Sequence, residues 1–130
     1  SGLRKLVLNT INVVSTPMQW AAVAALTEGE AFLERARAAY RQRRDRLVQG
    51  LRALGFACDL PQGTFYAFPN VERVLGPKSW EAFDVLLQRA RVSTVPGIVF
   101  GPHGEGHLRF TFSVALETIE AALEAMRAAL

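Results

Sequence analysis

The chain has 130 residues, of which 50% are hydrophobic and 21% are charged, and its formal net charge is +3. This composition is that of one folded globular domain and excludes a disordered tail. The single cysteine, Cys58, excludes an internal disulfide, no apolar run is long enough to span a bilayer, and the N-terminus lacks a signal-peptide pattern. We therefore expect a protein of the reducing cytoplasm that has no membrane partner.

The first expected helix begins at the sequence TPMQ, residues 16–19. A hydroxyl residue at the cap, a proline at the first helical position and a glutamine three residues after the cap are a typical helix start. This helix is predicted to run over residues 16–26. Residues 1–15 have neither a cap nor a clear hydrophobic period, and we expect them to form a leading segment.

A long second helix is predicted over residues 30–54, because its apolar residues recur at intervals of three, four or seven. Gly55 supplies its stop. Within this helix the run RQRRDR, residues 41–46, carries the densest charge of the chain. We interpret the run as a solvated helix face whose long alkyl stems cover apolar surface. The alternative is a basic nucleic-acid-binding domain, but the chain has none of the zinc-finger or aromatic RNA-binding patterns.

Two short strands, residues 56–59 and 64–68, are predicted on either side of the turn-forming sequence PQG at residues 61–63. A third helix, capped by Ser79 and carrying one apolar stripe, is expected to run to about Ala90. Residues 92–95 then have the character of a strand.

The last strand is predicted over residues 107–113, where apolar and polar residues alternate. One face carries Leu108, Phe110 and Phe112, and the other carries His107, Arg109, Thr111 and Ser113. A final amphipathic helix follows over residues 116–130. The order of elements predicts an α+β fold, a two-layer sandwich in which a small, mostly antiparallel sheet packs against helices.

Four motifs occur in order along the chain: TPMQ at 16–19, PQGTFYAFPNV at 61–71, VSTVPGIVFG at 92–101 and GEGHLRFTFS at 104–113. Together they resemble the C-terminal part of class I aminotransferases, fold-type-I enzymes that use pyridoxal phosphate. The segment FYAFPNV is most similar to the aspartate-aminotransferase-like branch. The resemblance implies that residues 16–130 are the small domain of such an enzyme, and that residues 1–15 connect it to a large domain that this sequence lacks.

Arg109 is the candidate substrate-binding residue. An arginine on the wet face of a sheet is ordinarily solvated. However, a guanidinium is also a planar fork that can hold both oxygens of a carboxylate, and a strand fixes that fork rigidly. The resemblance favours this second role, because the arginine at the matching position in the family binds the α-carboxylate of the amino-acid substrate.

The resemblance also implies a lysine that forms a Schiff base with pyridoxal phosphate. This chain has two lysines, Lys5 and Lys78. The tripeptide Gly2-Leu3-Arg4 is similar to the G-x-R element that follows the family's catalytic lysine, but Arg4 precedes Gln19 by only fifteen residues, too few for the family. We therefore expect the catalytic lysine upstream of residue 1, so that these residues alone are inactive and bind no cofactor. The complete enzyme is expected to be a homodimer acting on amino acids and 2-oxo acids.

Other candidate sites have less support. His103 and His107 have a helical ligand spacing, but neighbouring glycines and the lack of an acidic or cysteine cluster make a metal site improbable. Ser113 and His107 share a strand face without an acid to orient the histidine, which disfavours a hydrolase triad. A non-catalytic binding or assembly module, using an apolar surface that a large domain normally covers, stays open as an alternative.

Overall fold

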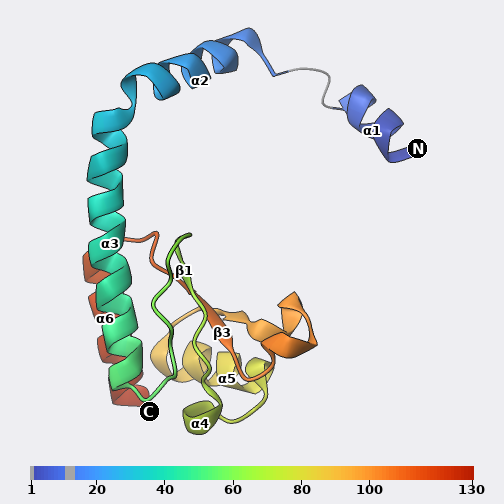
Figure 1. Cartoon of the computed structure of the whole chain (residues 1–130). Coiled ribbons are helices and arrows are strands. Elements are labelled where there is room, and N and C mark those ends of the chain that lie inside the picture. The colour runs from blue at the N-terminus through green and yellow to red at the C-terminus, as the bar shows by residue number, and fades with distance from the viewer. Residues whose placement is uncertain (1, 11–13) are drawn as a thin grey trace. The chain divides into compact units, whose positions relative to one another are not determined.

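The computed structural model describes residues 2–10 and 14–130. The chain divides into two compact units, Ser1–Arg37 and Ala38–Leu130, and Figure 1 shows their elements in chain order. Among the helices described, none combines the length and the apolar character that crossing a bilayer requires.

The first unit is helical. It holds α1 (Gly2–Thr10), α2 (Thr16–Glu28) and the first turns of α3 (Glu30–Ala53). Residues 2–10 form a helix although they lack a hydrophobic period, and two side chains near its end bond back to carbonyls one turn earlier: Asn9 Nδ2 to Lys5 O, and Thr10 Oγ1 to Leu6 O, both at 2.8 Å.

The start of α2 differs in detail from the prediction. Ser15, not Thr16, is the capping residue, and its carbonyl accepts the N–H groups of Met18 and Gln19 at 2.9 and 3.1 Å. The Gln19 side chain donates to the Val14 carbonyl at 2.7 Å instead of returning to the cap. Proline in the first turn is as expected, and the helix ends at Glu28, two residues later than predicted, with Gly29 as its C-cap.

The second unit is an α+β sandwich, which confirms the predicted fold class. Its strands are β1 (Tyr66–Ala67), β2 (Val95–Pro96) and β3 (Leu108–Thr111), in the order β1-β3-β2 with both pairs antiparallel. Its helices are the rest of α3, then α4 (Glu72–Leu75), α5 (Ser79–Val85) with a π-helical turn at Leu86–Ala90, and α6 (Leu116–Ala129). Two 3₁₀ turns, Gly97–Phe100 and Pro102–Gly104, join β2 to β3.

The hydrophobic core lies between one face of β3 and the helices. As the alternation predicts, Leu108, Phe110 and Phe112 are buried, with at most 5% of their surface exposed. They pack into one cluster with apolar side chains of α3 and α6: Leu47, Val48, Leu51, Ile119, Leu123 and Met126. Each such side chain contributes about 1.5–3 kcal/mol when it leaves water. The polar side chains of β3 are thereby fixed on the opposite face.

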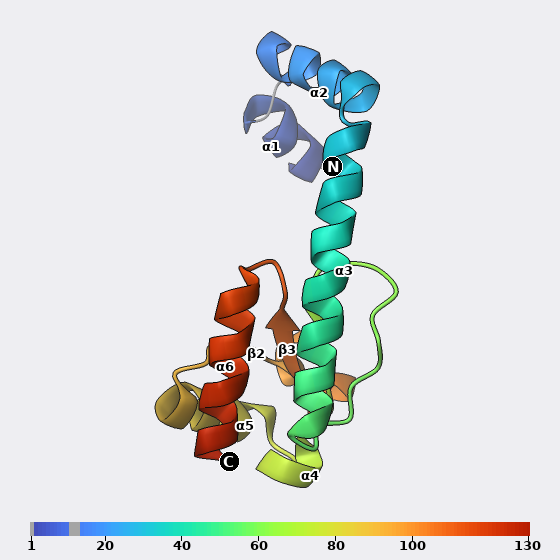
Figure 2. The ribbon, with the colours of Figure 1, turned by 90° about the vertical axis from the view of Figure 1, so that its left-hand side faces the viewer.

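The C-terminal half of α3 and α6 lie side by side, as the two views in Figures 1 and 2 show. At Gly50 the helices approach so closely that a Cβ atom would lie 2.3 Å from Leu123 Cδ1. Arg46 of α3 also pairs with the Glu120 carboxylate of α6 through both Nε and Nη2. Arg44 donates to the Pro61 carbonyl at 3.1 Å. The charge run at 41–46 therefore ties elements together as well as facing solvent.

Several predicted strands are wrong in extent. Residues 56–59 form no strand with 64–68; Ala57 instead makes an isolated bridge with Asn70, and β1 pairs with β3. The third helix ends at Ala90 as predicted, and Arg91 after it has a left-handed conformation with φ 57°. The predicted strand 92–95 is wrong in extent, because only Val95 and Pro96 pair with β3.

Candidate functional site

Arg109 lies on the polar face of the central strand, with a neighbouring strand on each side. The register pairs it with Val95 of β2 and pairs Thr111, two residues further on, with Tyr66 of β1. Because side chains two residues apart on a strand share a face, Arg109, Thr111, Tyr66 and Val95 all belong to the same side of the sheet. Arg109 is half-buried there, away from the apolar core.

A hollow of about 290 Å³ opens beside Arg109. Most of its lining residues carry a hydroxyl group, and Arg109 is the charged residue among them. The lining consists of Tyr66, Ser93, Thr94, Val95, Arg109, Thr111 and Ser113. Of the ion pairs found among the described residues, none includes Arg109. A half-buried guanidinium in such a hollow is suited to bind a small anion from outside the chain.

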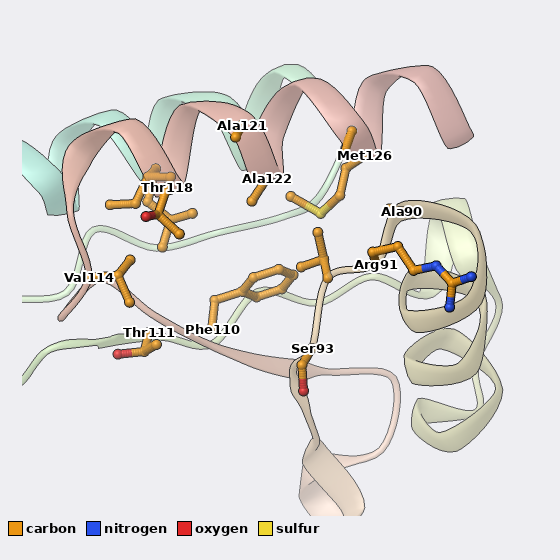
Figure 3. Close-up of a pocket in the computed structure, with 14 residues that line it drawn as sticks. Ala90, Arg91, Ser93, Phe110, Thr111, Val114, Thr118, Ala121, Ala122 and Met126 are labelled. Atoms are coloured by element: carbon orange, nitrogen blue, oxygen red, sulfur yellow. The ribbon is translucent and has the colours of Figure 1, made fainter.

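A larger hollow, of about 440 Å³, lies between α6 and the other face of β3. Figure 3 shows Phe110 and Met126 pointing into it, while the guanidinium of Arg91 extends to the side. Apart from that arginine its lining is apolar or hydroxylic, and it contains no carboxylate, histidine, lysine or cysteine. It therefore lacks the groups that acid, base or nucleophilic chemistry requires.

Two aromatic rings contact the guanidinium of Arg109. Its Cζ atom lies 4.1 Å from the ring centre of Tyr66 and 4.9 Å from that of Phe100. The sequence alone does not identify either ring as a contact of Arg109. The register of β1 with β3 brings Tyr66 beside Arg109.

The loop that delivers Phe100 is held by two features. Gly97 and Gly104 approach so closely that a Cβ atom on either would lie 2.0 Å from the carbonyl oxygen of the other. The Glu105 carboxylate accepts hydrogen bonds from the backbone N–H (2.5 Å) and the hydroxyl of Ser79, and the Ser79 hydroxyl also accepts the N–H of Ile98 at 3.3 Å. Ser79 is therefore buried in the first turn of α5, where its hydroxyl links Glu105 to Ile98. The predicted cap is wrong, because Lys78 and not Ser79 is the N-cap of α5.

Glu105 makes the stability of this loop depend on pH. Its hydrogen bonds from Ser79 lower the pKa of the Glu105 carboxyl below its ordinary value of 4.5. A group with a lowered pKa in the folded state stabilises the protein above its unfolded pKa, and this contribution is lost as the pH falls through the folded value. We expect Glu105→Gln to lower the urea midpoint at neutral pH, and the difference from wild type to shrink below about pH 4. A difference that stays constant down to about pH 3 would contradict this role.

His107 and Ser113 make local contacts. His107 Nδ1 donates to the Glu105 carbonyl at 2.9 Å, and its ring stacks on Phe68 with 5.1 Å between centres. Ser113 shares a 2.8 Å hydrogen bond with the Thr111 hydroxyl, so the nearest partner of its hydroxyl is not a histidine. Over residues 2–10 and 14–130 no three metal-ligating side chains come together.

Neither lysine fits a pyridoxal-phosphate site. Lys5 is exposed on α1. Lys78 Nζ donates to Glu81 Oε1 at 2.8 Å, and this hydrogen bond raises the pKa of the Lys78 ammonium. A Schiff-base lysine needs the opposite, an enclosed amine whose pKa is lowered. The described lysines therefore do not fit the role of the cofactor's Schiff-base lysine.

Comparisons with known proteins agree with the fold. The family model "Aminotransferase class I and II" matches residues 1–126. The aspartate/prephenate aminotransferase of Thermus thermophilus is 41% identical over 112 residues, which are 84% of this chain and 28% of that protein.

Two solved structures are similar in fold. The aromatic aminotransferase from Pyrococcus horikoshii has a TM-score of 0.87 at 32% identity and covers 95% of this chain and 33% of its own. The aspartate aminotransferase from Thermus thermophilus with maleate has a TM-score of 0.86 at 36% identity, and the match covers 97% of this chain and 33% of that chain. This chain belongs to the class I and II aminotransferases, and it spans 28% to 32% of the length of the curated relatives compared with it.

Proposed function

We propose that this chain forms the α-carboxylate-binding part of a pyridoxal-phosphate-dependent aminotransferase, which moves an amino group between an amino acid and a 2-oxo acid. The observation that carries the proposal is the position of Arg109, half-buried beside a hydroxyl-lined hollow on the polar face of β3. The family membership reported above supports the reaction class.

The proposed task of Arg109 is to hold both carboxylate oxygens of the substrate through two parallel N–H donors. Orienting a substrate in this way lowers the reaction barrier, because the bound substrate has already lost its translational and rotational freedom before the chemical step. Because Ser93, Thr111 and Ser113 line the same hollow, their hydroxyl groups are candidates for further hydrogen bonds to the bound carboxylate or to water beside it.

The side chain of the substrate stays open in this proposal. The names of the relatives mention aspartate, prephenate and aromatic substrates, which differ widely. The feature that amino acids and 2-oxo acids of all these kinds share is a carboxylate on the carbon that carries the amino or oxo group. This is the group that an arginine fork recognises.

The remaining parts of the enzyme are assigned by the same proposal. Residues 16–130 form its small domain, and residues 1–15 connect them to a large domain whose lysine holds pyridoxal phosphate. Neither Lys5 nor Lys78 is suited to that task, so these 130 residues alone are proposed to be inactive. We expect the complete enzyme, meaning the polypeptide that includes both domains, to be a cytoplasmic homodimer.

Substrate analogues test the proposal directly. In the complete enzyme, the kcat/KM for L-phenylalanine or L-aspartate should exceed that for the corresponding α-amide by about a hundredfold, because the amide has neither the charge nor the second oxygen. The measurement is the rate of amino transfer to a 2-oxo acid. Equal values for an amino acid and its α-amide would remove carboxylate recognition from the function. The absence of any amino transfer would remove the reaction class.

A further inference from the structure

The two rings beside Arg109 have no assigned task in the proposed function. Tyr66 is half-buried on β1, and Phe100, which is 55% exposed, ends the 3₁₀ turn after β2. Phe100 is not part of the hydrophobic core. It lies at the surface and contacts Phe68 edge-on, with 5.9 Å between the ring centres. Its position is therefore set by the loop and by its neighbours on the polar face.

The loop gives Phe100 little freedom. The 3₁₀ turn that carries it starts at Gly97, whose backbone is pressed against Gly104 and whose N–H donates to the His107 carbonyl at 2.8 Å. One residue later, the N–H of Ile98 is held by the Ser79 hydroxyl. Because both ends of the connection are fixed, the ring is presented to Arg109 by a rigid support.

Ring contacts suit an arginine that must bind a carboxylate. A guanidinium is attracted to the faces of aromatic rings, while its N–H donors all lie in its own plane. Contacts with rings can therefore restrain the group without using the donors that a carboxylate needs. Hydrogen bonds from a protein carboxylate would restrain it equally well but would occupy those donors.

We propose that Tyr66 and Phe100 are positioning residues, which orient the guanidinium of Arg109 so that its N–H edge faces the substrate carboxylate. This inference rests on the proposed function. The contact of Tyr66 is made through its ring and not its hydroxyl, so phenylalanine at position 66 should retain it.

The first test measures the guanidinium in this 130-residue chain without ligand. In ¹⁵N relaxation experiments, the Arg109 Nε–H group should be more ordered than that of Arg127, which is exposed on α6. Tyr66→Leu and Phe100→Leu should each lower the order of Arg109 toward that of Arg127, while Tyr66→Phe should preserve it. Trp80→Leu is the matched control, since Trp80 is also 55% exposed and stacks edge-on against Phe83, not against an arginine.

The second test measures amino transfer in the complete enzyme. Tyr66→Leu should raise KM for the amino acid about tenfold, the size expected for one cation–ring contact, with a smaller change in kcat, and Tyr66→Phe should restore it. If Arg109→Lys abolishes binding while Tyr66→Leu and Phe100→Leu leave both KM and the order of Arg109 unchanged, the inference is wrong. If Arg109→Lys is itself without effect, the proposed function fails instead. An equal loss of order in Trp80→Leu would also overturn the inference, because it would mark a general loosening.

Discussion

Replacing Arg109 by lysine is expected to lower the kcat/KM of the complete enzyme for its amino-acid substrate by about a hundredfold, or about 2.7 kcal/mol. Lysine keeps the positive charge, but its ammonium is a point donor that cannot form two parallel hydrogen bonds with a carboxylate. The loss in kcat/KM should therefore correspond to one charge-assisted hydrogen bond, plus the alignment of the substrate that the second bond provides. The measurement is the rate of the half-reaction with amino acid, followed by stopped-flow absorbance.

The fold should survive this change, because Arg109 lies outside the hydrophobic core and in none of the ion pairs among the described residues. Cofactor absorbance and the urea midpoint are thus expected to stay near the wild-type values. Arg127→Lys, a matched exchange on the exposed face of α6, should leave kcat/KM unchanged. An Arg109→Lys enzyme that is as efficient as wild type with every amino acid tested would exclude Arg109 from carboxylate binding.

Periodic patterns predicted the parts of the fold that depend on burial. The alternation in residues 107–113 placed Leu108, Phe110 and Phe112 in the core because one face of that strand packs against helices. The spacing within residues 30–54 and 116–130 predicted α3 and α6 to within one residue at each end, since each helix presents an apolar stripe to the same core. Such patterns are strong because a shift by one residue would move the whole apolar set into water.

Short strands and connections were harder to predict because long-range contacts decide them. Ala57 pairs with Asn70, and β1 pairs with β3, more than forty residues further along the chain. Strand β2 is only two residues long, and its pairing with β3 defines it. Nothing in the local composition of residues 56–59 or 92–95 reports these partners.

In the candidate site, as in the fold, local patterns predict some features and long-range contacts decide the others. The position of Arg109 on a polar strand face followed from the alternation of residues 107–113, and its proposed role comes from the resemblance to a family. The contacts of Tyr66 and Phe100 with Arg109 were not predicted, because they depend on the register of β1 and on the path of the loop after β2. The close approach of Gly97 and Gly104, which controls that path, leaves no signal in the sequence beyond the glycines themselves.

Gly97→Ala is expected to lower the free energy of unfolding by about 3 kcal/mol, the upper part of the range for overpacking a tight site. A Cβ atom at residue 97 would lie 2.0 Å from the Gly104 carbonyl oxygen and 2.8 Å from that of His107, and both are backbone atoms that cannot rotate away. The loop must move to relieve this overlap, and Phe100 moves with it. The change should therefore also raise KM for the amino acid, although residue 97 is not among the residues that line the hollow beside Arg109.

Gly63→Ala provides the control, because a Cβ atom there would meet nothing within 4 Å. Its free energy of unfolding should stay within about 0.5 kcal/mol of wild type, or rise slightly, since alanine reduces the freedom of the unfolded chain. Urea denaturation of the three proteins at neutral pH measures both effects. If Gly97→Ala were as stable as Gly63→Ala, the two backbone segments would have to separate without cost. The loop would then be too compliant to hold Phe100 against Arg109, and its part in orienting the guanidinium would be lost.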